Sequence, residues 1–567
     1  MVEILRATGL RRAMQRGLLI ALLLAGGIST PRLLANDADP SRGPTGRAGS
    51  LVIVGGGEIP PSILDRFLEL GGGEQARLVV ITTASSTAEW PLESQPHQRL
   101  WASRPLASLT VLHTRDPQVA NTAEFCRPLE TATAVWFVGG DQTQVTQTYL
   151  GTRTEASLHA VLARGGVIGG TSAGAAIMSR VMITGGRTDP RLGEGLGFLP
   201  GAIVDQHFLK RDRLPRLMAA LEQRPGHVGI GIDESTAVVV RKRTLEVIGD
   251  SECRLCLAPS HNRPELVQPI RSGESLDLET WRLAATARAR FGSYARADEL
   301  PAPNLRQGAV VITGGHTPPE AINAFLTAAG GKDVPVVLFS QKTDAATARQ
   351  QQLAESFRAA GAENVRVCEA GSLDDLDEAS FGEWLAEVRG VWLIGDRDQQ
   401  LLELVRQSQL RHLVTSVLDR GGAIGGSSAA ARIHGDGVIR RATSDDGQAL
   451  MAEAYECGLG LLPGMVIGDD NEEDDEPAAT VLATALRDRF PNCVGVGLKP
   501  EAAAVVRGHT LQVVGSNPVS VVGRSSQPDA KDPNASAYEL VQAGQVYDLR
   551  ARRVMAVETP AEDVETR

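Results

Sequence analysis

The chain has 567 residues, too many for one hydrophobic core of ordinary size, so we expect two or more domains. Hydrophobic residues make up 42% of it and charged residues 22%, which is typical of a soluble globular protein. The formal net charge of −11 and the lack of a basic stripe argue against a nucleic-acid-binding protein.

The N-terminus has the pattern of an export signal. Several arginines precede the apolar run GLLIALLLAGGI at 17–28, which is short for a membrane span. Small residues suited to cleavage follow, up to Ala35. We therefore assign residues 1–35 to a signal peptide and expect a protein exported to a periplasm or out of the cell. An uncleaved N-terminal anchor is the alternative.

The rest of the chain reads as two copies of one sequence. Six stretches of the first copy return in the same order in the second. SLVIVGGGEIPP at 50 returns as AVVITGGHTPP at 309, VWFVGGDQTQ at 135 as VWLIGDRDQQ at 391, and GGTSAGAA at 169 as GGSSAAAR at 425. GLGFLPGAIVDQH at 195 returns as GLGLLPGMVIGDD at 458, HVGIGIDESTAVVV at 227 as CVGVGLKPEAAAVV at 493, and GESLDL at 273 as GQVYDL at 544. We predict tandem domains at 50–286 and 306–555, joined by the proline-bearing linker LPAPNLRQ at 300–307.

Within each copy, short β-branched runs that end in glycine alternate with amphipathic helical stretches. Runs such as LVIVGGG and AVWFVGG are typical of buried parallel strands. PPSILDRFLELGG, with proline at its start and glycine at its stop, is typical of a helix. The alternation predicts an α/β fold, a three-layer α/β/α sandwich with a mainly parallel sheet. Ligands of such sheets bind beyond the carboxyl ends of the strands, where the glycine-rich loops lie.

The run GTSAG at 170–174 fits the G-x-S-x-G pattern of a nucleophile elbow, directly after a strand-like run. Such a turn exposes the hydroxyl of Ser172 at the start of a helix, and small neighbours are needed because the turn is crowded. The N–H of Ala173 would then face a developing oxyanion, aided by the helix dipole. Gly-Ser turns without chemistry are also common, so the elbow alone does not establish catalysis.

A serine nucleophile needs a base, and the best candidate in the first copy is His207 in the run VDQHF. Unlike the other histidines of that copy, it follows an apolar strand-like run inside a polar cluster. A carboxylate should orient the second ring nitrogen. Glu234 and its rival Asp233 both end another buried strand, in GIGIDE, and the spacing does not choose between them.

Together, GGTSAGA, DQHFLKRDRLPRL, FVGGDQ and GIGIDE resemble the cyanophycinases, in the peptidase E group of serine peptidases, over about residues 51–285. The resemblance implies a class I glutamine amidotransferase-like sandwich, here in two tandem copies. It also implies a triad of Ser172, His207 and Glu234, with a second oxyanion donor in the GGD loop, for which we choose Gly140. The substrate-binding residues that it implies are Gln142, Asp205, Gln206, Arg211, Arg213 and Arg216.

The family substrate is cyanophycin, a poly-aspartate whose side-chain carboxyls carry arginines, and family members release β-aspartyl-arginine dipeptides from its backbone. The guanidinium groups of Arg211, Arg213 and Arg216 suit the arginine carboxylates that stud this polymer. Asp205 or Asp141 suits the guanidinium groups of the polymer itself. Without the motifs, the same basic run would be typical of a solvated helix start.

Two other functions are considered beside an exported serine hydrolase that acts on cyanophycin or a related aspartyl-arginine polymer. One is a peptidase for small aspartyl or isoaspartyl peptides; the other is a non-catalytic binding protein. The sequence indicates no metal, nucleotide or redox cofactor. CRLC at 253–256 lacks a second pair or nearby histidines, so we expect a local disulfide or two free thiols rather than a zinc site.

The second copy keeps a serine at its elbow, Ser428, and loses what surrounds it. Its aligned replacements are Asp470 for His207, Pro500 for Glu234, Asp396 for Gly140 and Ala430 for Gly174. The basic run QHFLKRDR becomes acidic, DDNEEDDE at 469–476. A serine without a base has little nucleophilicity at neutral pH, so we predict an inactive copy.

We expect this inactive copy to be structural, taking the place of the second subunit of a homodimer within one chain as a pseudo-dimer. A homodimer of whole chains is the other assembly considered. An acidic loop that captures the arginine-rich polymer is the alternative role for the second copy.

Overall fold

The structure is a computed structural model that describes residues 49–91, 100–101, 103–341, 343–369, 386–407, 410–439, 446–469, 477–523 and 538–555. The predicted signal peptide at 1–35 lies outside these residues, as does the acidic run from Asp470 onward. No helix within the described ranges is long and apolar enough to cross a membrane.

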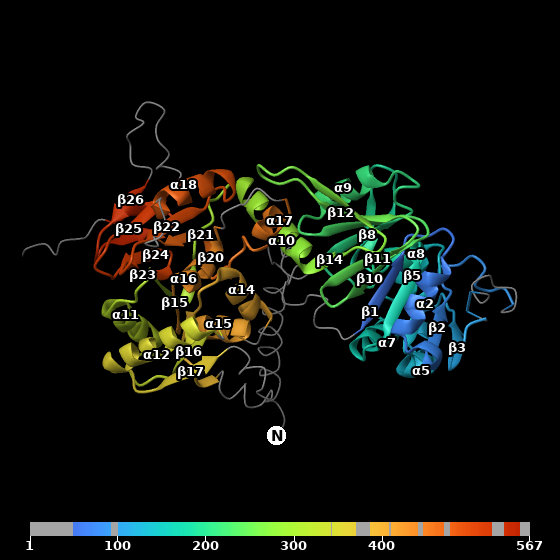
Figure 1. Cartoon of the computed structure of the whole chain (residues 1–567), viewed down its shortest axis with the longest axis horizontal. Helices are drawn as coiled ribbons and strands as arrows, with labels where there is room; N and C mark the ends of the chain where they lie inside the picture. Colours follow the sequence, from blue (N-terminus) through green and yellow to red (C-terminus); the bar gives the residue numbers. More distant parts are fainter. Residues whose placement is uncertain are drawn as a thin grey trace, which may run out of the picture. The chain divides into compact units, whose positions relative to one another are not determined.

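The described part of the first half forms an eight-stranded sheet in the order β14-β11-β10-β1-β5-β4-β2-β3 (Figure 1). Its strands are β1 (Ser50–Val54), β2 (Arg77–Ile81), β3 (Ser108–Leu112), β4 (Ala134–Phe137), β5 (Val167–Thr171), β10 (Thr236–Arg241), β11 (Thr244–Gly249) and β14 (Ser275–Asp277). Strands β1 to β5 pair in parallel, and β10, β11 and β14 extend the sheet antiparallel.

Helices cover both faces of this sheet, which confirms the three-layer sandwich. The helices of this half are α2 (Pro61–Leu70), α4 (Pro117–Ala120), α5 (Ala123–Thr131), α6 (Gln142–Tyr149), α7 (Arg153–Ala163), α8 (Ala173–Ala176), α9 (Leu214–Gln223) and α10 (Leu278–Ala295). Side chains of β1 alternate between the faces: Val52 packs in one apolar cluster with Phe67 of α2, and Ile53 packs in another with Leu158 of α7.

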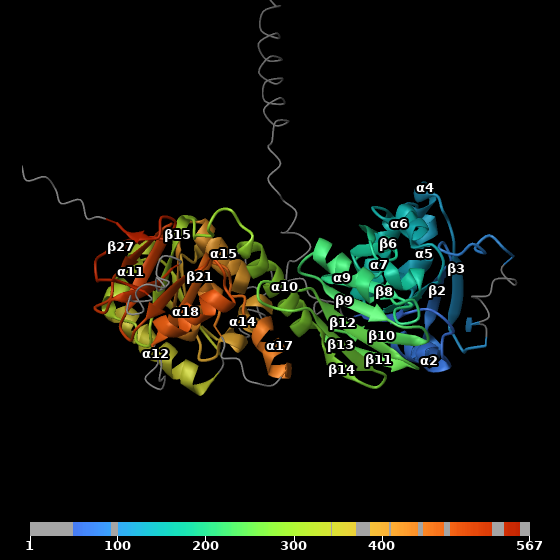
Figure 2. The same ribbon diagram turned by 90° about the horizontal axis from the view of Figure 1, so that it is seen from above.

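A second, four-stranded sheet in the same half has the order β13-β12-β9-β8 among the described residues. Its strands are β8 (Ala202–Gln206), β9 (Val228–Ile232), β12 (Glu252–Leu257) and β13 (Leu266–Arg271), and a separate hairpin joins β6 (Val181–Gly185) to β7 (Arg191–Glu194). Strands β8 and β9 run parallel, and α9 lies beside them (Figure 2). Their carboxyl ends carry His207 and Glu234.

The second half repeats this strand order in the residues that are described. Its large sheet runs β28-β27-β24-β23-β15-β19-β18-β16-β17 and its small one β20-β21-β22-β25-β26. The strands are β15 (Leu305–Thr313), β16 (Val336–Ser340), β17 (Val365–Glu369), β18 (Gly390–Ile394), β19 (Ala423–Ser427), β20 (Gly435–Gly437), β21 (Leu462–Asp469), β22 (Val494–Leu498), β23 (Ala503–Gly508), β24 (Thr510–Val513), β25 (Val519–Val522), β26 (Glu539–Val541), β27 (Val546–Asp548) and β28 (Arg553–Val554). The helices are α11 (Pro319–Ala329), α12 (Asp344–Ala359), α14 (Asp398–Gln407), α15 (Leu410–Asp419), α16 (Ala429–His434), α17 (Asp446–Ala454) and α18 (Ala478–Asp488).

The pairing register also matches between the halves. Val54 pairs with Thr171 across β1 and β5, and Thr313 pairs with Ser427 across β15 and β19. In each pair the second residue stands immediately before the serine of an elbow, so the structure aligns the two elbows as the sequence repeat does.

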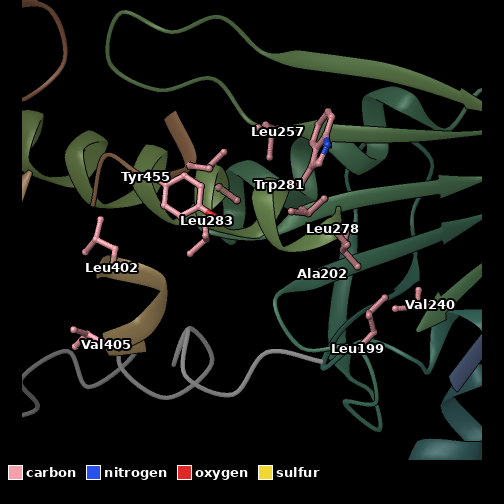
Figure 3. Close-up of a cluster of buried hydrophobic side chains, with 14 of the residues drawn as sticks. Leu199, Ala202, Val240, Leu257, Leu278, Trp281, Leu283, Leu402, Val405 and Tyr455 are labelled. Atoms are coloured by element: carbon pink, nitrogen blue, oxygen red, sulfur yellow. The ribbon is translucent and has the colours of Figure 1, made fainter. Parts of the chain in front are cut away.

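The join between the halves differs from the predicted linker. Helix α10 continues to Ala295, beyond the expected end of the first domain at 286, and β15 begins at Leu305, inside the stretch predicted as linker. Figure 3 shows a buried apolar cluster to which this helix contributes Leu283, together with Leu402 of α14 and Tyr455. The helix therefore packs against residues of both halves.

The CRLC run lies on β12, and its two cysteines are free. Cys253 belongs to one buried apolar cluster and Cys256 to another, because residues three apart on a strand point to opposite faces of the sheet. Of the two expected outcomes, a local disulfide or free thiols, the structure shows free thiols.

Candidate active site

Ser172 lies on the sharp turn between β5 and α8, with φ 53° and ψ −107°. Its N–H donates to the carbonyl of Val54 at 3.1 Å, which ties the turn to β1. The flanking glycines are required by space, since a Cβ at Gly170 would lie 2.6 Å from the Gly174 oxygen and one at Gly174 2.5 Å from the Phe137 oxygen. The geometry is that of a nucleophile elbow.

His207 follows β8 and bridges Ser172 to Glu234. Its Nε2 lies 2.9 Å from the Ser172 hydroxyl oxygen, and its Nδ1 lies 2.6 Å from Oε1 of Glu234, just after β9. Burial lowers the pKa of His207, and the Glu234 hydrogen bond only partly opposes this. The ring is therefore neutral at neutral pH, and the network assigns its proton to Nδ1, so that Nε2 accepts from the serine.

The loop after β1, residues 55–57, forms the seat of this histidine. A Cβ at Gly56, whose φ is +111°, would lie 2.2 Å from Cε1 of His207, and one at Gly57 would lie 2.9 Å from Cβ of Glu234. The backbone N–H of His207 donates to the carbonyl of Gly55 at 2.7 Å. The sequence reasoning did not assign this loop to the site, although three successive glycines at the carboxyl end of a strand are a signal that marks it.

The two adjacent carboxylates after β9 have different partners. Glu234 contacts the imidazole, whereas Asp233 turns away and accepts hydrogen bonds from the N–H groups of Leu209 and Lys210, at 3.1 and 3.0 Å. The geometry therefore favours Glu234 over Asp233 as the residue that orients His207.

The two N–H groups expected to stabilise an oxyanion follow the carboxyl ends of two neighbouring strands, β5 and β4. Ala173 is the first residue of α8, where the N–H groups of a helix have no intrahelical acceptor. Gly140 follows β4, the neighbour of β5, and has a φ of 141°. A Cβ there would lie 2.0 Å from the Ala84 oxygen, so the backbone of this loop fits only glycine. Their role in catalysis stays a prediction.

The three arginines predicted to bind substrate have different surroundings. Arg211 is exposed and Arg213 is half-buried. Arg216 is 5% exposed, and each of its three guanidinium nitrogens donates inside the protein: Nε to Asp205 at 2.9 Å, Nη2 also to Asp205, and Nη1 to the Gly186 oxygen at 2.9 Å. Asp205 is itself fully buried.

Arg213 also donates to Asp205, at 3.4 Å, and to the carbonyl of Gln206, and burial lowers its pKa to about 10. The buried Asp205–Arg216 ion pair thus holds the carboxyl end of β8 in place. Of the three arginines, Arg211 is the one that is exposed to solvent. Substrate contact by Asp205, Arg213 and Arg216 stays a prediction.

The two glutamines of the predicted site lie on different elements, α6 and β8. Gln142 opens α6, and its Nε2 donates to the Ile183 carbonyl at 3.0 Å. Gln206 precedes His207 and is 6% exposed, and its Oε1 has no partner among the described residues. An acceptor that is buried without a partner is suited to a donor group of a ligand. No group of three potential metal ligands lies together in the described part of the chain.

The second elbow keeps the backbone of the first with different chemistry around it. Ser428 has φ 49° and ψ −117°. The guanidinium of Arg432 lies between Asp398, at 2.9 Å, and Asp469. Pro500 stands where the first half has Glu234, and Asp470, aligned with His207, lies outside the described residues.

Comparison with known proteins gives one family model and several relatives that match this chain. Residues 51–248 match the model of peptidase family S51. The chain is similar to the cyanophycinase of Geminocystis herdmanii, with 34% identity over 35% of this chain and 77% of the relative. The cyanophycinase of Trichormus variabilis is 31% identical over 39% of this chain and 76% of the relative, and that of Synechococcus elongatus is 32% identical over 36% and 67%.

Solved structures show weaker similarity. A peptidase from an acI-B1 actinobacterium is 23% identical, covers 41% of this chain and 98% of its own, and has a TM-score of 0.32. A putative peptidase E from Listeria monocytogenes is 12% identical, covers 37% and 98%, and has a TM-score of 0.28. The assignment therefore depends on the sequence relatives and on the family model, whose matched residues 51–248 include Ser172, His207 and Glu234. By these matches, the chain belongs to peptidase family S51.

Proposed function

We propose that the first half is a serine peptidase in which Ser172 is the nucleophile, His207 the general base and acid, and Glu234 the residue that orients His207. The observation that carries the proposal is the unbroken line of hydrogen bonds through these side chains, 2.9 Å from serine to histidine and 2.6 Å from histidine to glutamate. A hydroxyl that donates to a neutral imidazole can lose its proton as it forms a bond to carbon.

The proposed reaction proceeds in two steps. The Ser172 oxygen attacks the carbonyl carbon of the peptide while its proton passes to Nε2 of His207, and the N–H groups of Ala173 and Gly140 stabilise the oxyanion. His207 then gives this proton to the leaving amine, which departs and leaves an acyl-enzyme. Water, deprotonated by the same histidine, hydrolyses the ester and releases the acid product. Glu234 stays ionised and holds the proton of the imidazole on Nδ1.

The proposed substrate is the aspartyl backbone of cyanophycin, with β-aspartyl-arginine dipeptides as product. The names of the curated relatives support this substrate class, since each match covers at least 67% of the relative. The exposed Arg211, next to the half-buried Arg213, adds a basic group near the imidazole that suits the carboxylates of such a polymer. We further propose that the chain is exported and that residues 1–35 are its signal peptide, on the pattern of their sequence.

The second half is proposed to be a structural, inactive copy that replaces a second subunit. Pro500 supplies no carboxylate at the position of Glu234, and the ion pairs of Arg432 with Asp398 and Asp469 lie beside its elbow. A serine in that setting has no described group that would accept its proton.

The test is release of dipeptides from insoluble cyanophycin by the chain without residues 1–35, beside the same assay on a panel of aspartyl and isoaspartyl dipeptides. We expect release of β-aspartyl-arginine from the polymer, its loss in Ser172→Ala, and no effect of EDTA. Cleavage of the dipeptides alone would move the substrate to small aspartyl peptides. Unchanged release by Ser172→Ala would refute the serine mechanism, and no cleavage of any substrate, with no labelling of Ser172 by a fluorophosphonate, would favour a binding protein.

A further inference from the structure

The turn that follows His207 has an acceptor for each of five successive backbone N–H groups. These are the Gly55 oxygen for His207 at 2.7 Å, the Ile232 oxygen for Phe208 at 3.1 Å, Oδ1 of Asp233 for Leu209 at 3.1 Å and for Lys210 at 3.0 Å, and the His207 oxygen for Arg211 at 3.1 Å. Two of the five thus depend on a single carboxylate oxygen from another strand. Asp233 caps this turn as an aspartate caps the first turn of a helix, but from outside the segment.

The capping carboxylate is itself held in place. Its Oδ2 accepts a hydrogen bond from the Ser251 hydroxyl at 3.0 Å, and the Ser251 N–H donates to Oγ1 of Thr236 at 2.9 Å. Ser251 lies in the turn between β11 and β12. The side chain of Asp233 therefore connects the turn after His207 to the turn between β11 and β12.

His207 needs such support because its backbone is left-handed, with a φ of 51°. A residue with a side chain adopts this conformation only where its surroundings determine it. The two adjacent carboxylates have complementary roles, since Glu234 holds the ring of His207 and Asp233 holds the backbone of the residues after it.

The second half shows that the fold itself does not require this carboxylate. Lys499 stands at the position aligned with Asp233, yet β21 and β22 pair in parallel as β8 and β9 do. The backbone there is also placed alike, since a Cβ at Gly55 would lie 2.1 Å from the Asp233 oxygen and one at Gly314 2.1 Å from the Lys499 oxygen. The carboxylate is present in the half that has His207 and absent from the half in which Asp470 is aligned with that histidine.

We propose that Asp233 is a positioning residue for His207, which it keeps aligned with Ser172 by capping the turn at Leu209 and Lys210. The proposal rests on the proposed function, in which His207 is the base. It gives Asp233 a role in the reaction that involves no contact with the substrate.

The experiment measures how fast a fluorophosphonate ester modifies Ser172 in the full chain, with the modified residue located by mass spectrometry. The final stoichiometry gives the folded fraction, and the rate constant gives the alignment of serine with histidine. We expect Asp233→Ala to lower the rate constant roughly 10- to 100-fold, because a misplacement of about 1 Å costs that much. Asp233→Asn should stay near the wild-type rate, since its amide oxygen can accept the same two N–H groups.

Asp250→Ala is the matched control, because Asp250 is an exposed carboxylate of the same β11–β12 turn, and it should react at the wild-type rate. If Asp233→Ala does not fold, Ser251→Ala removes only the outer hydrogen bond and should slow labelling by a smaller factor. A wild-type rate in Asp233→Ala, or in Ser251→Ala where the first variant is unfolded, would overturn the proposal. An Asp233→Asn variant as slow as Asp233→Ala would do the same, because charge rather than capping would then matter. Failure of Ser172 labelling in the wild type would instead overturn the proposed function.

Discussion

Gly56 lies directly against the ring of His207, so closely that a Cβ atom at Gly56 would come within 2.2 Å of the ring carbon Cε1. The neighbouring Gly57 has the same relation to Glu234, at 2.9 Å from its Cβ. Backbone thus occupies the space on one side of the histidine–glutamate pair, and no side chain can enter it. The position of the ring is set by this contact as well as by its two hydrogen bonds.

Gly56→Ala should therefore abolish catalysis. The added methyl group would displace the imidazole, and the φ of +111° adds strain for any residue with a Cβ. We expect kcat to fall by roughly 100-fold or more, because the serine–histidine alignment is lost. The measurement is dipeptide release at saturating substrate.

The aligned glycine of the second half, Gly315, provides the control for this substitution. No atom of the described residues lies within 4 Å of a Cβ built at Gly315, so Gly315→Ala should leave kcat unchanged. Equal losses in the two variants would mean that the glycines act on the fold, and a fully active Gly56→Ala would contradict the seat that we describe for His207.

Much of this site could be predicted from the sequence because its elements are local. The GTSAG run specifies its own turn, and the strand-like runs before Ser172, His207 and Glu234 end at the edge of the sheets where ligands bind. The choice between Asp233 and Glu234 could not be made in the same way. Neighbours on a chain leave a strand in different directions, and which of the two reaches the imidazole depends on the path of the turn beyond His207.

The basic run after His207 illustrates a second limit. Its resemblance to the family predicts that Arg211, Arg213 and Arg216 all bind substrate. Whether a guanidinium faces solvent, however, depends on which carboxylates the fold buries beside it. Asp205 is fully buried and forms an ion pair with Arg216, which the sequence pattern does not reveal. The Gly55–Gly57 loop is missed for a related reason, since its function is a close approach to residues about 150 positions away along the chain.

The activity should extend into mild acid. His207 must be neutral to accept the serine proton, and burial holds its pKa below the ordinary value of 6.5. The imidazole therefore stays neutral as the pH falls from 7 through that ordinary value, and the rate of Ser172 modification should decline only as the pH drops through the lowered pKa. A pH series of fluorophosphonate labelling measures this. A rate that halves near pH 7 or above would contradict it.

Arg216→Ala should act on stability and Arg211→Ala on substrate binding. Removing Arg216 leaves the buried carboxylate of Asp205 without its main partner, which typically costs about 3–5 kcal/mol of the free energy of unfolding. Arg211 is exposed, so its removal should leave the Tm unchanged while it raises KM for the polymer. Thermal unfolding and steady-state kinetics on both variants test this. A stable Arg216→Ala with a raised KM would make Arg216 a substrate ligand instead.

Ser428→Ala should leave activity unchanged. The second elbow has the strained backbone of the first, but Pro500 provides no carboxylate to orient a base, and the nearby Arg432 is held by Asp398 and Asp469. Fluorophosphonate should accordingly label Ser172 and not Ser428 in the wild-type chain. Labelling at Ser428, or a severalfold loss of turnover in the variant, would mean that another group near Pro500, such as Glu501, serves as a base.

The second half should be needed for the stability of the first, through helix α10. Arg288 of that helix is 8% exposed and forms a bidentate ion pair with Glu453 of the second half. Its Nε donates to Oε1 at 2.5 Å and its Nη2 to Oε2 at 3.2 Å. Leu283 of the same helix is buried in the apolar cluster that includes Leu402 and Tyr455 (Figure 3). A chain that ends at residue 300 would expose these groups to water.

We therefore expect a fragment of residues 36–300 to be poorly soluble or to unfold at a lower temperature than the full chain. In the full chain, Glu453→Ala should lower the free energy of unfolding by about 3–5 kcal/mol, since it leaves Arg288 buried without a counter-charge. Glu320→Ala, on the exposed first turn of α11, is the matched control and should have no such effect. Thermal unfolding and sedimentation of the three proteins give the answer. A soluble, monomeric and fully active fragment would refute the structural role of the second half and would favour the alternative in which its acidic run captures the arginine-rich polymer.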